Sequence, residues 1–310
     1  MTEYVRVFTV VGMLAGHPTT RDYPAAHGLS LRADTWGKPS DPPVIFMHGG
    51  GQTRHAWGNT AREVAEKGFF SISLDLRGHG DSDWHDDGDY SIDAYADDLK
   101  EVVSAFDTAP VLVGASLGGL TALIAEGERH PGLARAVVFV DITPRMEKDG
   151  VDRIMRFMSA SPDGFETVGD AADAVAEFLP HRPRPSDHSG LRKNLRRGPD
   201  GRYHWHWDPG FLTSRLDRPR DRKLEVEWQE RLDNAARSLA LPCMLVRGRM
   251  SDIVSEQGAR EFCELVPHAE FVDVADAAHM VAGDKNDAFS AAVCSFLDSL
   301  TGGDGSRRSA

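Results

Sequence analysis

The chain has 310 residues, of which 41% are hydrophobic and 27% charged, a composition typical of a globular protein with a substantial core. Its 48 acidic residues outnumber its 35 basic residues, and the formal net charge of −13 disfavours nucleic acid or an anionic membrane as a partner. The cysteines, Cys243, Cys263 and Cys294, lack metal-type spacing and are typical of reduced thiols in a cytoplasmic protein. No apolar run approaches 18 residues, so no transmembrane helix is expected.

Strand-like and helix-like segments alternate over the first 141 residues. The apolar run 7–15 predicts a first strand better than a secretory signal, because no basic start or small-residue cleavage site accompanies it. Further strands are predicted at 29–36, 43–47, 69–74, 111–114 and 136–141, and helices at 61–67, 93–106 and 117–130. Such alternation indicates a parallel sheet with helices on both faces.

The alternation stops between about residues 145 and 235. This stretch is rich in Arg, Pro and Trp, lacks strand patterns, and has helical segments at 151–159, 170–178 and 222–238. The alternation resumes with strands at 243–247 and 270–274 and helices at 256–266 and 287–300. We therefore predict a core of 1–144 and 236–300, an inserted helical lid of 145–235, and a disordered Gly/Ser-rich tail of 301–310.

One turn carries the pattern of an activated serine. Gly114-Ala-Ser116-Leu-Gly118 follows a buried strand and opens an amphipathic helix. A serine hydroxyl is a weak nucleophile, so it must project from the backbone and meet a base. A sharp strand–turn–helix does this, and small residues on both sides avoid a collision across the turn. We predict that Ser116 is the nucleophile; the alternative is an ordinary glycine-rich turn.

A glycine loop follows the strand 43–47. In His48-Gly49-Gly50-Gly51-Gln52, backbone N–H groups are free of side-chain obstruction and can face a substrate oxygen. We expect the N–H groups of Gly50 and Leu117 to form an oxyanion hole, with Gly49 and Gly51 as less favoured candidates. A flexible loop or a phosphate cradle is the alternative, but no G-x-G-x-x-G or P-loop lysine is present. His48 precedes the loop and is expected to be structural.

Three sequence runs together resemble a known family: HGGGQ at 48–52, DLRGHGDS at 75–82 and GASLGG at 114–119. They look like the α/β-hydrolase superfamily, in the branch that holds epoxide hydrolases, haloperoxidase-like esterases and cofactor-free C–C hydrolases. The resemblance covers about residues 29–141 and 241–300. It implies an α/β-hydrolase fold, with a mostly parallel eight-stranded sheet and an inserted helical cap, and it implies no cofactor or metal. The run 75–82 is a structural turn in this family.

The family order of a catalytic triad is Ser, then Asp or Glu, then His. His279 follows the predicted last strand and is the expected base. Asp252 follows the strand 243–247 and is the preferred acid, while Asp141, at the end of 136–141, is the rival. On this assignment Asp252→Asn should collapse turnover and Asp141→Asn should mostly spare it. The opposite result would assign the role of the acid to Asp141.

The lid contains two unusual stretches. In Tyr203-His-Trp205-His-Trp207 the alternating rings indicate packing or a substrate pocket, with Asp141 and Met280 as further lining candidates; a metal site is weakly supported. The basic run 182–197 is either a solvated face or a receptor for a substrate carboxylate. The second reading favours half-esters such as monoalkyl phthalates.

These observations predict a serine carboxylic-ester hydrolase that acts on small to medium esters. A C–C hydrolase or a lactonase would share the triad, and perhydrolysis is a plausible side activity. A ligand-binding receptor with slow turnover is an alternative of another class. Serine at position 116 argues against epoxide and haloalkane hydrolysis, which need an aspartate nucleophile. We expect a cytoplasmic monomer or homodimer with a small-molecule substrate.

Overall fold

The computed structural model describes residues 16–180, 187–216, 221–275, 277–279 and 286–302. The predicted strand at 7–15, Met280 and residues 303–310 of the predicted tail lie outside these ranges. Residues 301 and 302 belong to the last helix, α11 (Asn286–Gly302).

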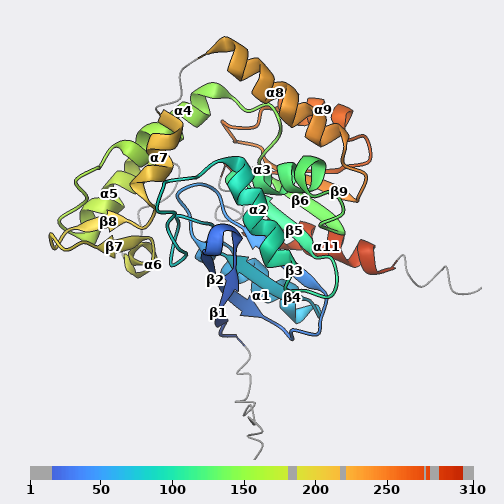
Figure 1. Ribbon diagram of the computed structural model, residues 1–310, viewed down its shortest axis with the longest axis horizontal. Helices are drawn as coiled ribbons and strands as arrows, with labels where there is room; N and C mark the ends of the chain where they lie inside the picture. Colours follow the sequence, from blue (N-terminus) through green and yellow to red (C-terminus); the bar gives the residue numbers. More distant parts are fainter. Residues whose placement is uncertain (1–15, 181–186, 217–220, 276, 280–285, 303–310) are drawn as a thin grey trace, which may run out of the picture.

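An eight-stranded sheet forms the core, in the order β1-β2-β4-β3-β5-β6-β9-β10 (Figure 1). β1 and β2 pair antiparallel, as do β2 and β4, and the remaining neighbours are parallel. The predicted α/β-hydrolase fold is thus confirmed. β1 was not predicted, because its residues TTRDYP are largely exposed and show no apolar alternation. The strands are β1 (Thr19–Pro24), β2 (Ser30–Trp36), β3 (Pro43–Met47), β4 (Phe70–Leu74), β5 (Val111–Ala115), β6 (Ala136–Val140), β9 (Cys243–Gly248) and β10 (Glu270–Val274).

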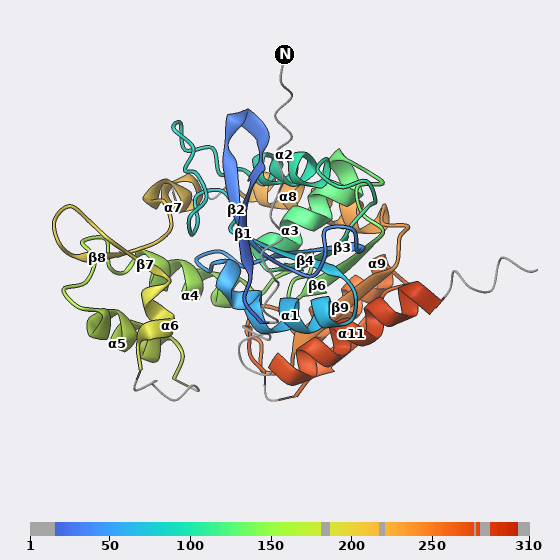
Figure 2. The ribbon, with the colours of Figure 1, turned by 90° about the horizontal axis from the view of Figure 1, so that it is seen from below.

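Helices cover both faces of the sheet, and each face has its own apolar core (Figure 2). α1 (Gly58–Glu66) packs beside α11 on one face. The other face carries α2 (Ile92–Val103), α3 (Leu117–Ile124), α8 (Arg222–Arg237) and α9 (Glu256–Leu265). The central strands are therefore buried on both sides, which explains the continuous apolar sequences of β3 and β6. β4, with the sequence FSISL, is equally buried but includes two serines.

The segment between β6 and β9 leaves the sheet and forms a separate lobe (Figure 1). We call α4 to α7 the cap; α8 then returns to the core, where it contacts α3 and α9. The cap consists of α4 (Lys148–Ser159), α5 (Val168–Phe178), α6 (Ser189–Arg192), β7 (Leu195–Arg197), β8 (Tyr203–Trp205) and α7 (Pro209–Leu216).

A two-stranded antiparallel sheet of β7 and β8 lies within the cap. The expectation that this stretch lacks strands was therefore wrong. Each strand has only three residues, too few for an alternating pattern to stand out. The intervening Gly-Pro-Asp-Gly is a turn signal that could have indicated the hairpin. Among the described residues, no helix is long and apolar enough to cross a membrane.

Candidate active site

Ser116 lies at a strained turn between β5 and α3. Its backbone has φ 45° and ψ −109°, a conformation rare for a residue with a side chain. A Cβ atom on Gly114 would lie 2.5 Å from the carbonyl carbon of Gly118, and one on Gly118 would lie 2.4 Å from the carbonyl oxygen of Met47. The glycines of G-x-S-x-G are therefore required by close backbone approach. The turn raises Ser116 above the carboxyl edge of the sheet, at the start of a helix.

His279 is paired with Asp141. The Nδ1–H of His279 donates to Oδ2 of Asp141 at 2.7 Å. The Asp141 side chain is fully buried, and it also accepts from the backbone N–H of Gly248 at 3.0 Å and from the hydroxyl of Ser251. These bonds fix the carboxylate, which in turn fixes the imidazole tautomer and leaves Nε2 as the ring nitrogen that can take a proton.

Asp252 does not occupy the position expected for the acid. Its carboxylate accepts from Nε of Arg153, on α4, at 2.8 Å, and lies 2.7 Å from Nη2 of the same residue. The side chain is 40% exposed, whereas that of Asp141 is 0% exposed. The prediction that Asp252 orients His279 is therefore not in agreement with the structure, and the rival Asp141 is the partner. β6 and β9 are parallel neighbours, so both candidates follow strand ends at the same edge of the sheet.

The glycine loop after β3 leaves one N–H group without a protein partner among the described residues. The N–H of Gly49 donates to Oε1 of Gln52 at 3.0 Å, and the N–H of Gly51 donates to Nε2 of His79 at 3.2 Å. No such bond is found for Gly50 or for Leu117, the first residue of α3. This arrangement favours Gly50 over its two neighbours as an oxyanion donor beside Leu117.

Three buried histidine rings surround the same loop. His48 donates from Nδ1 to the carbonyl of Gly49 at 2.8 Å and accepts from the N–H of Leu76 at 3.0 Å. His79 and His206 contact Gly51. His48 was expected to be structural, and His79 belongs to the run 75–82, which was predicted to be a structural turn. His206 lies in the noted His/Trp stretch, but no local signal showed that its ring turns toward the core.

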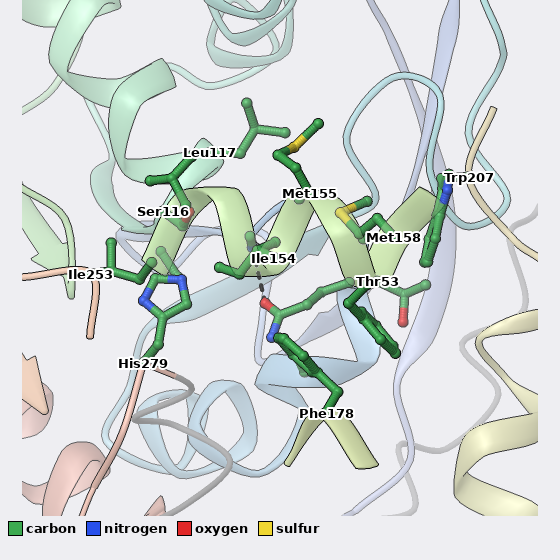
Figure 3. Close-up of a pocket in the computed structure, with 18 of the residues that line it drawn as sticks. Thr53, Ser116, Leu117, Ile154, Met155, Met158, Phe178, Trp207, Ile253 and His279 are labelled. Atoms are coloured by element: carbon green, nitrogen blue, oxygen red, sulfur yellow. Dashed lines mark hydrogen bonds between the residues drawn. The ribbon is translucent and has the colours of Figure 1, made fainter. Parts of the chain in front are cut away.

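A cavity of about 590 Å³ opens in front of Ser116, between the core and the cap. Ser116 and His279 lie at one end, and α4 crosses the cavity with Ile154, Met155 and Met158 (Figure 3). Two ring pairs stack in the cap, Phe157 with Phe178 at 4.2 Å and Trp205 with Trp207 at 5.0 Å between centroids, and all four line the cavity. Its wall is therefore apolar and aromatic.

The basic run 182–197 does not contribute a guanidinium to this cavity among the residues described. Arg196 donates to the carbonyl of Gly80 and lies over the ring of Trp84, and Arg192 and Arg197 are exposed. Arg182 and Arg184 lie outside the described residues. Arg153 is the only Arg, Lys, Asp or Glu in the described lining, and its charge is already matched by Asp252. The described part of the chain also has no cluster of three or more His, Cys, Asp or Glu that could hold a metal ion.

The burial of His206 predicts that the protein loses stability as the pH falls. Burial lowers its pKa from 6.5 to about 3. Between these two values the unfolded chain binds a proton that the folded chain does not, so the free energy of unfolding rises with pH. The contribution is complete above about pH 6.5 and is lost as the pH falls toward 3, by about 1.4 kcal/mol per pH unit once the unfolded group is protonated.

Urea unfolding at several pH values between 7.5 and 4.5 measures how the free energy of unfolding changes with pH. We expect His206→Gln to show a shallower loss of stability in acid than the wild type. Equal slopes in wild type and His206→Gln would show that His206 does not titrate in this way.

Comparison with known proteins agrees with this architecture. The α/β-hydrolase fold family matches residues 42–285. Esterase Rv0045c of Mycobacterium tuberculosis is 31% identical over 284 residues, which cover 87% of each chain. The 2-(acetamidomethylene)succinate hydrolase of Mesorhizobium japonicum is 27% identical and covers 89% of this chain and 98% of its own. A solved structure of the mycobacterial esterase superposes with a TM-score of 0.71 at 29% identity, covering 91% of this chain and 92% of that one.

The fold, the serine turn and the sequence match define the class: this chain belongs to the α/β-hydrolase fold family. Its named relatives are an esterase and a hydrolase, so its broad class is hydrolase.

Proposed function

We propose that this protein is a serine carboxylic-ester hydrolase with Ser116 as nucleophile, His279 as base and Asp141 as the acid that orients the base. The hydrogen bond between His279 and the buried Asp141, beside a strained serine at the end of an apolar cavity, carries the proposal. The name of the mycobacterial relative, an esterase, supports the same reaction class.

The reaction would proceed in two stages. The oxygen of Ser116 attacks the ester carbonyl while Nε2 of His279 takes the hydroxyl proton. The N–H groups of Gly50 and Leu117 stabilise the oxyanion that forms. His279 returns the proton to the leaving alcohol, which leaves an acyl-enzyme on Ser116. Water then attacks the acyl carbonyl while His279 takes its proton, and His279 passes this proton to the oxygen of Ser116 as the acid is released. Asp141 holds the imidazole in place and stabilises its charged form.

The cavity indicates the kind of ester. Its wall is apolar, and its one described guanidinium, on Arg153, is held by Asp252 and by the carbonyl of Phe178. A second carboxylate on the substrate would have to displace Asp252 from this guanidinium. We therefore infer a preference for neutral esters with an apolar or aromatic acyl group, and half-esters such as monoalkyl phthalates become the less favoured substrates.

A substrate panel tests this proposal. It comprises p-nitrophenyl acetate, hexanoate and benzoate, a neutral dialkyl phthalate with its monoalkyl counterpart, a lactone, and a vinylogous diketone. We expect higher kcat/KM for hexanoate and benzoate than for acetate, and for the diester than for the half-ester. A clear preference for the half-ester would overturn the substrate class, and exclusive turnover of the lactone or the diketone would overturn the ester assignment.

A further inference from the structure

Each of three successive peptide units in the glycine loop is held by a different histidine ring. The carbonyl of Gly49 accepts from Nδ1–H of His48 at 2.8 Å. The N–H of Gly51 donates to Nε2 of His79 at 3.2 Å. The carbonyl of Gly51 accepts from Nε2–H of His206 at 3.2 Å. The rings are neighbours, with centroids 5.1 Å apart for His48 and His79 and 5.8 Å apart for His79 and His206.

These bonds orient the N–H that the proposed function uses. The C=O and N–H of a trans peptide point in opposite directions. The carbonyl of Gly49 is held by His48 and also accepts from the N–H of Gln52 at 3.1 Å, so the N–H of Gly50 in the same peptide unit points to the other side. Holding the next two peptide units keeps that direction, since glycines otherwise rotate freely.

His206 differs from the other two because it comes from the cap. It follows β8 and is 1% exposed, and its Nδ1 accepts from the N–H of Gly80 in the core at 2.7 Å. That bond requires Nδ1 to be unprotonated, so the ring proton is on Nε2, where it donates to Gly51. Burial lowers the pKa of this ring to about 3, which keeps it in this neutral form.

The segment that carries His206 also touches the cavity. Trp205 and Trp207 line the cavity, whereas His206 between them points to the glycine loop. A Cβ atom on Gly51 would lie 3.4 Å from the Trp207 ring, so the loop and this segment are in direct contact. One short stretch of the cap thus meets both the substrate space and the loop that carries the oxyanion donor.

We propose that His206 is a positioning residue through which the cap sets the oxyanion hole: its Nε2–H bond to Gly51 holds the loop with the Gly50 N–H directed at the substrate oxygen. This inference rests on the proposed ester hydrolysis. It assigns to the cap a part in transition-state stabilisation besides covering the cavity.

Two substitutions separate the two bonds of this ring. In His206→Asn the amide oxygen can replace Nδ1 and accept from Gly80, but nothing reaches Gly51. In His206→Gln the amide N–H can replace Nε2–H and donate to Gly51, but the bond from Gly80 is lost. We expect His206→Asn to lower kcat by about 10- to 100-fold, with KM nearly unchanged, because a misplaced oxyanion donor costs rate more than ground-state binding. His206→Gln should stay within about fivefold of wild type, an estimate from the retained donor.

Inhibitor binding distinguishes positioning from a general structural role. A trifluoromethyl ketone adds to Ser116 and places an oxyanion in the hole, whereas the matching methyl ketone acts mainly as a ground-state ligand. In His206→Asn the affinity for the trifluoromethyl ketone should fall in parallel with kcat/KM, and that for the methyl ketone should stay near wild type. His204→Asn, two residues earlier in β8 and bonded to Asp200, is the matched control and should change neither.

Several results would overturn the inference. A wild-type kcat in folded His206→Asn, or an equal loss of kcat in His206→Gln, would show that the bond to Gly51 does not position the oxyanion donor. The ring tautomers in the wild type can be read by NMR of 15N-histidine-labelled protein, which keeps the test open if a variant does not fold. We expect the proton of His206 on Nε2, and a proton on Nδ1 would contradict the proposal. Absence of ester turnover in the wild type would instead refute the proposed function itself.

Discussion

Asp141→Asn is expected to lower kcat/KM for a p-nitrophenyl ester by about 10⁴-fold, the size of effect found when a triad carboxylate becomes an amide. The carboxylate of Asp141 accepts from Nδ1–H of His279, and an amide there can present its own N–H and favour the wrong imidazole tautomer. Because Asn has nearly the same shape, the fold should be retained. Steady-state kinetics with a thermal unfolding check measure the effect.

Asp252→Asn is the matched control for this prediction. It makes the same change, from carboxylate to amide, at the side chain bound to Arg153. Asp252 lies in the loop after β9, the strand next to β6 in the sheet. We expect kcat within about threefold of wild type, because an exposed or half-exposed ion pair contributes little and Asp252 does not contact His279. KM can change, since Arg153 lines the cavity. A collapse of turnover in Asp252→Asn with near-normal Asp141→Asn would restore Asp252 as the acid.

Ser116→Ala is expected to lower kcat by about 10⁶-fold, the loss seen when the nucleophile of a serine triad is removed. Only the hydroxyl is lost, and the backbone strain at φ 45° is the same for alanine, so the protein should remain folded. The cavity keeps its apolar wall, and product acids or methyl ketones should bind with near wild-type affinity.

Ser104→Ala, which removes an exposed hydroxyl bonded to the carbonyl of Glu101, serves as the control and should retain full activity. Substantial turnover by Ser116→Ala would mean that another group starts the reaction. Loss of ligand binding together with activity would instead indicate that the variant has lost the structure of the site.

The sequence predicts the parts of this site that are local. The serine turn can be recognised within five residues, although only Gly114 is required by a contact across the turn itself; Gly118 is required by the close approach of Met47 on the neighbouring strand β3. The strands β3 and β6 are equally easy to predict, since each is buried on both faces and continuously apolar. β1 was not predicted, because an exposed strand at the edge of a sheet needs no continuous apolar sequence.

The acid could not be assigned from chain order. Asp141 and Asp252 both follow parallel strands whose ends meet at one edge of the sheet, so order along the chain does not separate them. The difference lies in how each side chain is held. Asp141 adopts φ 47° and receives bonds from Gly248 and Ser251, 107 and 110 residues away, whereas Arg153 of the cap engages Asp252. The contact of His206 with Gly51 spans 155 residues and is equally beyond a local pattern.

The claim that Ser116 is activated by His279 and Asp141 is tested most directly by covalent labelling. The wild type, Asp141→Asn and Asp252→Asn are treated with a fluorophosphonate, the rate of mass increase is followed, and the modified peptide is sequenced by mass spectrometry. We expect one adduct, on Ser116, formed at similar rates in wild type and Asp252→Asn and far more slowly in Asp141→Asn. An adduct on another residue, or slow labelling in Asp252→Asn with normal labelling in Asp141→Asn, would contradict it.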